Sequence, residues 1–149
     1  EIDGSCKTIF TDWDNRLDSS HFVQSDYGSE LLFNIPFISS VKLKGIVVIC
    51  NEEGTAPKKV KLFKNKDKMT FDQINCESEQ EIDLHVDLDG SIQYLTKPVK
   101  LSSMNSLSLY FSESDDEETI RINYIGLRGE FVAAHRHGVT ICNYEIRPT

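Results

Sequence analysis

The densest run of β-forming apolar residues in this chain lies at residues 29–50, which read SELLFNIPFISSVKLKGIVVIC. In its first part, Leu31, Phe33 and Ile35 occupy alternate positions. A period of two places these side chains on one face of a strand, so the run predicts a half-buried β-strand rather than a helix. Pro36 has no N–H for a ladder hydrogen bond, and we expect the strand to end, bulge or run along an edge there.

The second part of this run indicates a strand that is covered on both faces. Val41 and Leu43 resume the alternation, Gly45 interrupts it, and residues 46–49 are an unbroken series of Ile and Val. A glycine inside a strand is typical of a bend or bulge, and an unbroken β-branched run is typical of a strand buried from both sides. The run therefore predicts an all-β fold in which sheet packs on sheet.

Length and charge limit the class of protein. A chain of 149 residues is most simply one domain, long enough to bury roughly 70% of its unfolded surface. Its 24 acidic residues outnumber its 16 basic ones, and the net charge of −8 repels nucleic acid and anionic lipid, so we expect neither as a partner. No apolar run is long enough to span a bilayer.

The four cysteines are widely spaced, and no Cys-x-x-Cys pair occurs. This spacing favours a reducing environment over a disulfide framework. Cys50 closes the apolar run and Cys142 lies in a similar context, so we expect both to be small buried hydrophobes rather than redox groups.

Residues 1–27 predict an irregular arm laid over a β-sandwich that is formed by residues 28–147. Apolar residues in the arm follow no clean period. Trp13 is its expected anchor, because a tryptophan in a polar segment more often covers the end of a core than offers a stacking platform for a sugar or base.

Residues 58–68 form the one basic stripe that the sequence shows in this acidic chain. In a strand, Lys59 and Lys61 face water while the apolar residues between them face the core. Together with Lys58, they form a hydrated face that discourages edge pairing, or they dock an acidic protein. Nucleic acid is the weakest alternative, because the stripe has no interleaved exposed aromatic residue beyond Phe63.

Alternating apolar residues predict a hairpin in the middle of the chain. Leu84 would face Tyr94, and Val86 would face Ile92, across a three-residue loop that ends with Gly90 in the left-handed conformation. A two-residue turn would break that match.

A second predicted hairpin joins residues 107–111 to residues 120–124. Its connection concentrates carboxylates at a loop tip, where they are hydrated, contact a basic partner or hold a cation. A cation is the weakest of these, because a carboxylate run without other fixed ligands is poorly preorganised. The candidate binding residues in this loop are Asp115, Asp116, Glu117 and Glu118.

The C-terminal segment adds four candidate binding residues: Arg128, His135, Arg136 and His137. His135 and His137 stand at positions i and i+2, which share one face of a strand, as in the first motif of metal-binding cupin barrels. The rest of that motif is absent, since no histidine follows His137. A polar surface that binds acidic groups is therefore favoured over a metal site.

The sequence contains no motif for catalysis or for cofactor binding. It has no glycine-rich phosphate loop, no His-Glu-x-x-His and no Gly-x-Ser-x-Gly. We therefore expect a binding module without catalytic residues, cofactor or metal.

Four blocks of the chain resemble successive blocks of a known family: SDYGSELLFNIPFISSVKLKGIVV, VKLFKNKDKMTFD, TIRINYIGLRGE and VTICNYE. The family is the PITH domain, the proteasome-interacting thioredoxin domain, and the resemblance extends from about Trp13 to Glu145. The chain is most similar to stand-alone PITH domain-containing proteins, which lack the thioredoxin half. The resemblance implies a jelly-roll β-sandwich of two packed antiparallel sheets, similar to galactose-binding-like domains, and supplies no catalytic residues.

The resemblance also implies association with the 26S proteasome, in the cytosol or nucleus. The expected function is a non-enzymatic adaptor that is a monomer outside the complex and docks through its oppositely charged loops. The alternative is a lectin-like jelly roll that binds a carbohydrate through loops at one end of the sandwich.

Overall fold

The computed structural model describes residues 13–17, 22–25, 28–66, 69–114, 119–132 and 139–142. Within these ranges the regular structure is β-strand, with two short 3-10 helices and no α-helix. The described part contains no helix long and apolar enough to cross a membrane. The elements are η2 (Trp13–Asn15), β1 (Val23–Gln24), β2 (Glu30–Ile49), β3 (Lys59–Lys64), η3 (Phe71–Gln73), β4 (Gln80–Asp83), β5 (Tyr94–Leu95), β6 (Met104–Ser112), β7 (Arg121–Ile122), β8 (Tyr124–Val132) and β9 (Val139–Cys142).

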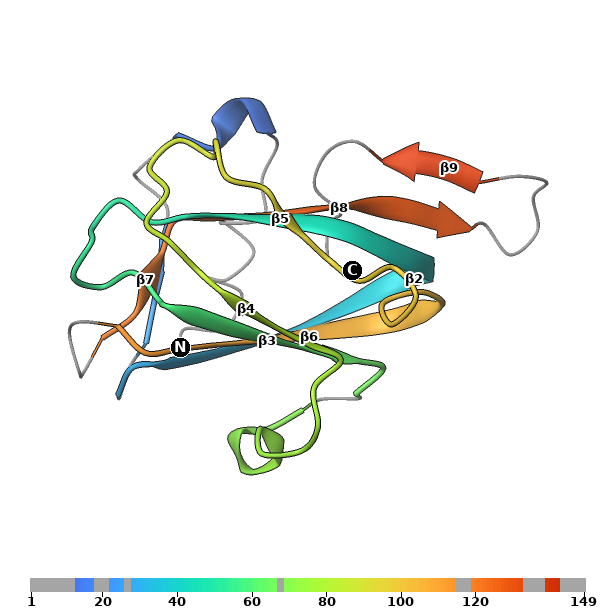
Figure 1. Ribbon diagram of the computed structural model, residues 1–149, viewed down its shortest axis with the longest axis horizontal. Helices are drawn as coiled ribbons and strands as arrows, with labels where there is room; N and C mark the ends of the chain where they lie inside the picture. The colour runs from blue at the N-terminus through green and yellow to red at the C-terminus, as the bar shows by residue number, and fades with distance from the viewer. Residues whose placement is uncertain are drawn as a thin grey trace.

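Strand β2 organises the fold, because it belongs to both layers of a sandwich (Figure 1). Its first half pairs with β6 from Glu30 to Pro36, and its second half pairs with β8 from Ser40 to Ile49. The register shifts after Pro36, where the strand passes from one layer to the other, as the proline predicts.

The two layers follow from this pairing. The lower layer in Figure 1 contains β4, β3, β6 and the first half of β2, and the upper layer contains β5, the second half of β2, β8 and β9. Every pairing is antiparallel. The predicted all-β sandwich is therefore confirmed.

The core lies between the layers and takes side chains from both. Leu31, Phe33 and Ile35 point into it from the first half of β2 and are at most 5% exposed. A second register shift falls between Leu43 and Gly45, where a bulge was expected. The residues from both layers that share this cluster include Val41, Leu43, Ile46, Val48, Val60, Leu62, Leu107, Leu109, Phe111, Ile125 and Leu127.

Each layer is also covered on its outer side, which explains the unbroken apolar run at residues 46–49. Val47 and Ile49 face outward from the upper layer and pack with Tyr124 under Trp13. Phe63, Tyr110 and Leu32 form the corresponding outer cluster of the lower layer, with Met69 and Ile74. All four residues of the run are at most 4% exposed, so the expectation of a strand covered on both faces is confirmed.

The first predicted hairpin is wrong, because its two strands lie in different layers. β4 pairs with β3, whereas β5 pairs with β2. Side chains bridge the two instead: the Tyr94 hydroxyl accepts from the His85 N–H at 2.8 Å and donates to the His85 carbonyl at 3.2 Å. The Gln80 amide likewise contacts the backbones of Leu95 and Lys97 at 3.2 and 2.8 Å.

The loop between β4 and β5 is built around Asp87 rather than around a hairpin turn. The Asp87 carboxylate is 3% exposed and accepts hydrogen bonds from four backbone N–H groups, at residues 89–92. The Asp87 carbonyl accepts from the N–H of Cys50, which ties the loop to the end of β2. Gly90 has a φ of +83°, which is the expected left-handed conformation, but it belongs to this loop and not to a hairpin turn.

The second predicted hairpin is also wrong. β6 pairs with β3 and β2, and β8 pairs with β2 and β9. Between them, β7 pairs with β1 and closes one end of the sandwich, with Val23 and Ile122 in the core. Alternation had specified which side chains point inward, but it cannot specify which strand is the neighbour.

Candidate protein-interaction surface

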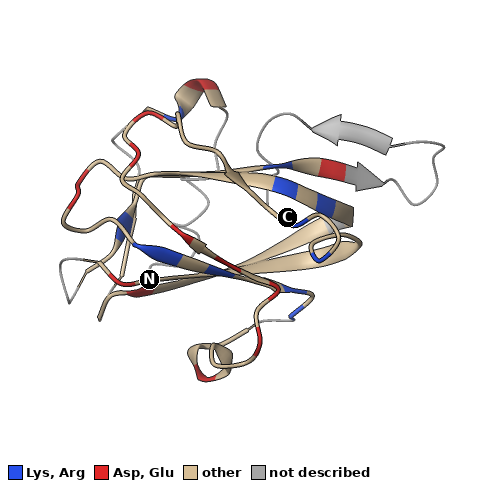
Figure 2. Cartoon of the chain, viewed as in Figure 1, with Lys and Arg blue, Asp and Glu red and all other residues tan. Residues whose placement is uncertain are grey.

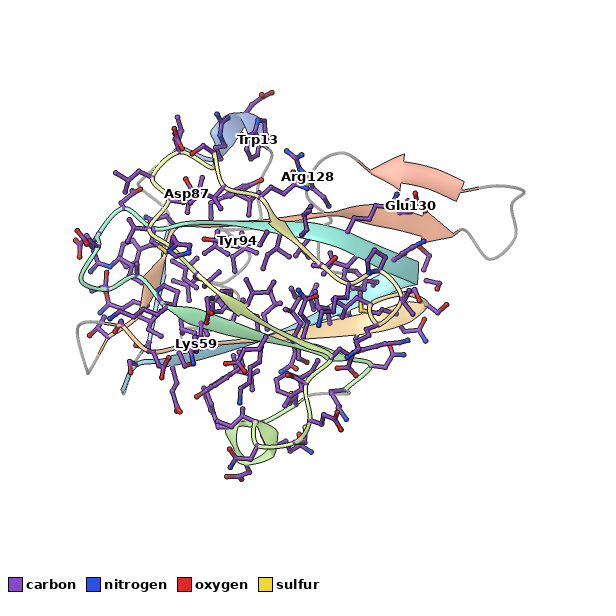
Figure 3. All side chains as sticks on the ribbon, viewed as in Figure 1. Trp13, Lys59, Asp87, Tyr94, Arg128 and Glu130 are labelled. Atoms are coloured by element: carbon purple, nitrogen blue, oxygen red, sulfur yellow. The ribbon has the colours of Figure 1, made fainter. Side chains whose placement is uncertain are left out.

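The structure separates the candidate binding residues rather than gathering them. Lys59 and Lys61 lie on β3 in the lower layer, and Arg128 lies on β8 in the upper layer (Figure 3). Lys58 lines a pocket of about 450 Å³ at the end of the sandwich, beside His85. The other candidates lie outside the described residues: Asp115, Asp116, Glu117, Glu118, His135, Arg136 and His137.

A polar groove of about 390 Å³ crosses the lower layer, and the predicted basic stripe forms part of it. The ammonium group of Lys59 lies 3.7 Å from a carboxylate oxygen of Glu81 and 3.7 Å from one of Glu113. The Tyr110 hydroxyl donates to Glu30 at 2.6 Å, and burial together with this carboxylate raises the pKa of Tyr110 well above its usual value. Two carboxylates therefore offset the charge of Lys59 in this groove.

The pairing of β3 with β4 brings these opposite charges together. Lys61 lies opposite Glu81 on β4, and Lys59 lies opposite Asp83. Opposite charges on neighbouring strands are favourable pairs, but they are distant in sequence. The two lysines of the stripe that line this groove therefore face carboxylates in the folded protein.

The outer side of the upper layer has a different character, with Trp13 at its centre. The Trp13 ring packs edge-on against Tyr124, with centroids 6.2 Å apart. The guanidinium group of Arg16 lies 4.0 Å from the Trp13 ring centroid, and that of Arg128 lies 5.4 Å away (Figure 3). These contacts favour the packing interpretation of Trp13 over a bare stacking platform.

Arg128 is held in place by a contact that depends on a glycine. Its Nη1 donates to the Gln93 side-chain oxygen at 2.8 Å. The Gln93 side chain crosses β2 at Gly45, where an added Cβ would lie 2.7 Å from Gln93 Nε2. The absence of a side chain at Gly45 thus lets Gln93, which directly precedes β5, reach Arg128.

The lysines of β2 continue this face. Lys44 forms an ion pair with Glu130, and Lys42 lies opposite Glu130 across the strand pair. The hydrogen bond from Lys44 is the main cause that lowers the pKa of Glu130. Glu130 is one acid among several bases, and Figure 2 shows basic residues gathered along this end of β2.

The strands of the two layers differ in their balance of acidic and basic residues. The strands of the upper layer contain three bases and one acid: Lys42, Lys44, Arg128 and Glu130. Those of the lower layer contain three of each: Lys59, Lys61, Lys64, Glu30, Glu81 and Asp83. Sequence reasoning missed the lysines of β2, although their alternation with Val41 and Leu43 already placed them on the outward face.

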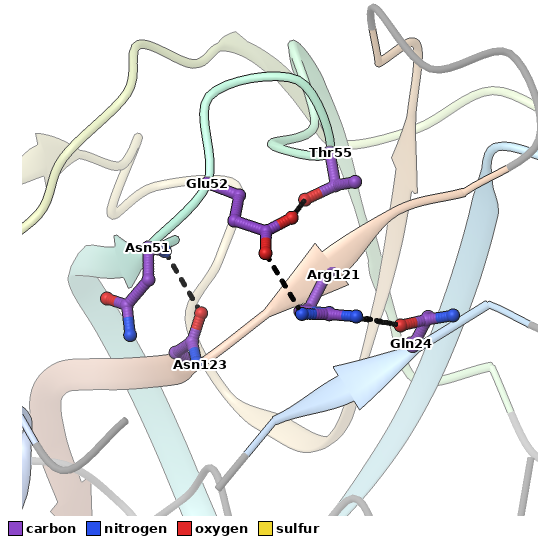
Figure 4. Close-up of polar contacts among 6 residues, drawn as sticks. All are labelled: Gln24, Asn51, Glu52, Thr55, Arg121 and Asn123. Atoms are coloured by element: carbon purple, nitrogen blue, oxygen red, sulfur yellow. Dashed lines mark hydrogen bonds and ion pairs between the residues drawn. The ribbon is translucent and has the colours of Figure 1, made fainter. Parts of the chain in front are cut away.

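The loops at the end closed by β1 and β7 are held by a side-chain network (Figure 4). Arg121 donates to the Gln24 side-chain oxygen at 3.0 and 2.7 Å and to Glu52 at 3.2 Å. The Asn51 N–H donates to the Asn123 side-chain oxygen at 3.0 Å. This end of the sandwich is therefore cross-linked between β1, β7 and the loop after β2.

The described residues contain no group of three His, Cys, Asp or Glu side chains arranged to hold a metal ion. Cys50 is 3% exposed, and burial, followed by the nearby Asp87, raises the pKa of its thiol to about 12. This confirms the prediction that Cys50 is a buried hydrophobe. The side chain of Cys142 lies outside the described part.

The family model for the PITH domain matches residues 1–148. The chain belongs to the PITH domain family. A PITH domain-containing protein of Drosophila pseudoobscura is 52% identical over 147 residues, which cover 99% of this chain and 70% of the relative. PITH domain-containing protein 1 of Homo sapiens is 43% identical over 143 residues, covering 96% and 68%, and that of Dictyostelium discoideum is 38% identical over 149 residues, covering 99% and 73%.

Membership confirms the resemblance carried by the four sequence blocks. At the level of the family, it supports a role in protein interaction for this PITH domain. Such a role needs an exposed surface with a chemical preference, and the outer side of the upper layer is a candidate for it.

Proposed function

We propose that this PITH domain is a non-enzymatic protein-interaction module that docks on the 26S proteasome. The match of the PITH model to residues 1–148 carries the proposal. Association with the 26S proteasome is what the resemblance of the four sequence blocks to this family implies. The module acts in the cytoplasm and nucleus and is a monomer outside the complex.

The charge distribution supports docking that is steered by electrostatics. The chain carries a net charge of −8, yet the strands of its upper layer contain three bases and one acid. Opposite-sign patches on one molecule orient it as it approaches a charged partner, which raises the association rate and makes binding salt-sensitive. The carboxylates at residues 115–118 and the basic residues at 135–137 remain candidate contacts with the partner.

Affinity capture with purified 26S proteasome tests the proposal. The tagged chain should retain proteasome at ~50 mM salt and lose most of it at ~300 mM, because the Debye length falls below the distances between surface charges. An unrelated acidic domain of equal net charge is the control. Retention no greater than that of the control would contradict the proposal.

A further inference from the structure

A turn at residues 97–100 carries an exposed apolar side chain without an evident structural role. Val99 at its tip is 91% exposed, and Leu95 on the adjoining strand β5 is 75% exposed. These are the two most exposed large apolar side chains in the described part of the chain. Single exposed aliphatic residues are ordinary on a protein surface, so exposure alone assigns no role to them.

The turn is held rigidly against β2, which distinguishes it from an ordinary loop tip. The Thr96 N–H donates to the Lys44 carbonyl at 3.0 Å, and the Thr96 hydroxyl donates to the Leu43 carbonyl at 2.6 Å. On the other side of the turn, the Leu43 N–H donates to the Leu101 carbonyl at 2.8 Å, and Leu101 is fully buried. Both ends of the turn are therefore fixed to Leu43 of β2, and the first end is also fixed to Lys44.

The two segments that meet at the turn carry basic residues and no acidic ones. Residues 40–46 and 93–105, which meet at this junction, contain Lys42, Lys44, Lys97 and Lys100 and no Asp or Glu. The one carboxylate that contacts these lysines in the described structure comes from Glu130 on β8. In a chain with 24 acidic residues, this is a marked segregation of charge. Figure 2 shows basic residues on the end of β2 and on the turn beside it.

We propose that this junction, the Val99 surface, docks an acidic, aliphatic-containing segment of a partner protein. The Val99 surface consists of Lys42, Lys44, Leu95, Lys97, Val99 and Lys100. Its lysines are complementary to carboxylates, and a fixed turn presents Val99 with little ordering cost on binding. The inference rests on the proposed role in protein interaction, but it does not require the partner to be the proteasome.

Nucleic acid fits the same surface less well. Its exposed apolar groups are aliphatic, whereas binding of single strands uses aromatic side chains on which bases stack. The net charge of −8 also opposes the approach of a long polyphosphate. An acidic protein segment with aliphatic side chains is complementary to both the lysines and the exposed aliphatic side chains of the Val99 surface.

Chemical-shift mapping on the complete, isotopically labelled chain tests the proposal. The probe is a dodecapeptide of Glu and Asp with interspersed Leu, and the matched control peptide has Gln and Asn in place of the acids. We expect the acidic peptide to perturb the amides of residues 42–46 and 95–100, and we expect the control peptide to perturb them far less. Perturbations centred on the groove of the lower layer, or none at all, would overturn the proposal.

Variants separate the charge from the apolar tip. Lys97→Glu with Lys100→Glu should weaken binding of the acidic peptide about tenfold or more, and Val99→Ser should weaken it a few-fold. Lys64→Glu with Lys66→Glu, on and just after β3, changes the net charge equally and should have a much smaller effect. An equal loss of peptide affinity in both double variants would show that the peptide responds to net charge and not to this surface, and would contradict the inference.

Two further outcomes are decisive. A single-stranded oligonucleotide that binds the same amides more tightly than the peptide would show a preference for polyphosphate and would overturn the assignment to a protein segment. Peptide binding at the Val99 surface without proteasome capture would leave this inference standing while contradicting the proposed partner. If the Lys97→Glu/Lys100→Glu variant and the unmodified chain captured proteasome equally and neither bound the peptide, the proposed partner would stand and this inference would be contradicted.

Discussion

Both outer sides of the sandwich are covered, but the two covers are held by different means. On the lower layer, Met69 is 3% exposed and packs with Phe63 and Tyr110, while the Asn34 amide bonds to both the N–H and the carbonyl of Met69, at 3.1 and 2.9 Å. On the upper layer, the cover is η2, and contacts of side chains hold it: Trp13 against Tyr124 and under two arginines.

The two kinds of attachment differ in how firmly they hold the cover and in what they leave exposed. A cover fixed through backbone hydrogen bonds and a buried side chain is costly to displace. A cover fixed by partly exposed rings and guanidinium groups is held less firmly and leaves cationic groups at the surface. Charge follows the same division, since the strands of the lower layer contain three acids and three bases, whereas those of the upper layer contain one acid and three bases.

The largest expected effect concerns the strand on which the upper face is built. At Gly129 of β8, an added Cβ would lie 2.2 Å from the carbonyl oxygen of Lys42, a backbone atom that cannot rotate away. Gly129→Ala should therefore lower the free energy of unfolding by about 3 kcal/mol or more, or prevent folding. Chemical denaturation followed by circular dichroism measures it. At Gly54, a Cβ would meet nothing within 4 Å, so Gly54→Ala should change stability by less than about 0.5 kcal/mol.

The next effect tests the lower cover. Met69→Ala removes a buried side chain from the cluster with Phe63 and should cost about 2 to 3 kcal/mol. Phe71 follows closely in the chain but is 48% exposed, so Phe71→Ala should cost less than about 1 kcal/mol. Thermal unfolding of both variants gives the comparison. Equal losses would show that residue 69 is no more part of the fold than the exposed turn beside it.

The upper cover should open before the sheet unfolds. Trp13 is the one tryptophan in the sequence, so its fluorescence reports on this cover alone. We expect the fluorescence transition in urea to precede the transition in far-ultraviolet circular dichroism, as in local opening of a weakly held segment. Trp13→Ala should lower global stability by about 1 to 2 kcal/mol, less than removal of Met69, because Trp13 is only partly buried. Coincident transitions would mean that the two covers are equivalent.

Patterns within one segment were enough to predict the parts of the fold that depend on local geometry. The alternation of Leu31, Phe33 and Ile35 predicted the inward face of β2, and Pro36 and Gly45 predicted where its register shifts. These features follow from the period of a strand and from the backbone properties of proline and glycine.

Pairing between distant segments was not predictable by the same means. Both hairpins were predicted from adjacency in the chain, yet β4 and β5 entered different layers. A side chain, Tyr94, supplies the contact that a backbone ladder was expected to make. The same limit applies to the surface: the lysines of residues 58–68 read as one basic stripe, but Glu81 and Glu113 approach only after folding.

The smallest expected effect lies on the upper face, at the ion pair between Lys44 and Glu130. Lys44 lowers the pKa of Glu130, so the folded state favours the carboxylate, and this stabilisation is present above the pKa that Glu130 has in the unfolded chain. It is lost as pH falls through the lower pKa of the folded state, where both states bind the proton. The melting temperature of the unmodified chain should therefore exceed that of Glu130→Gln slightly at pH 7, and the difference should vanish at acidic pH and shrink in high salt. Lys44→Met should remove the same pH-dependent difference, because either substitution leaves the pair incomplete. A difference that persisted at low pH would show that Glu130 stabilises the strand through packing rather than charge. The ion pair with Lys44 would then contribute nothing measurable to stability.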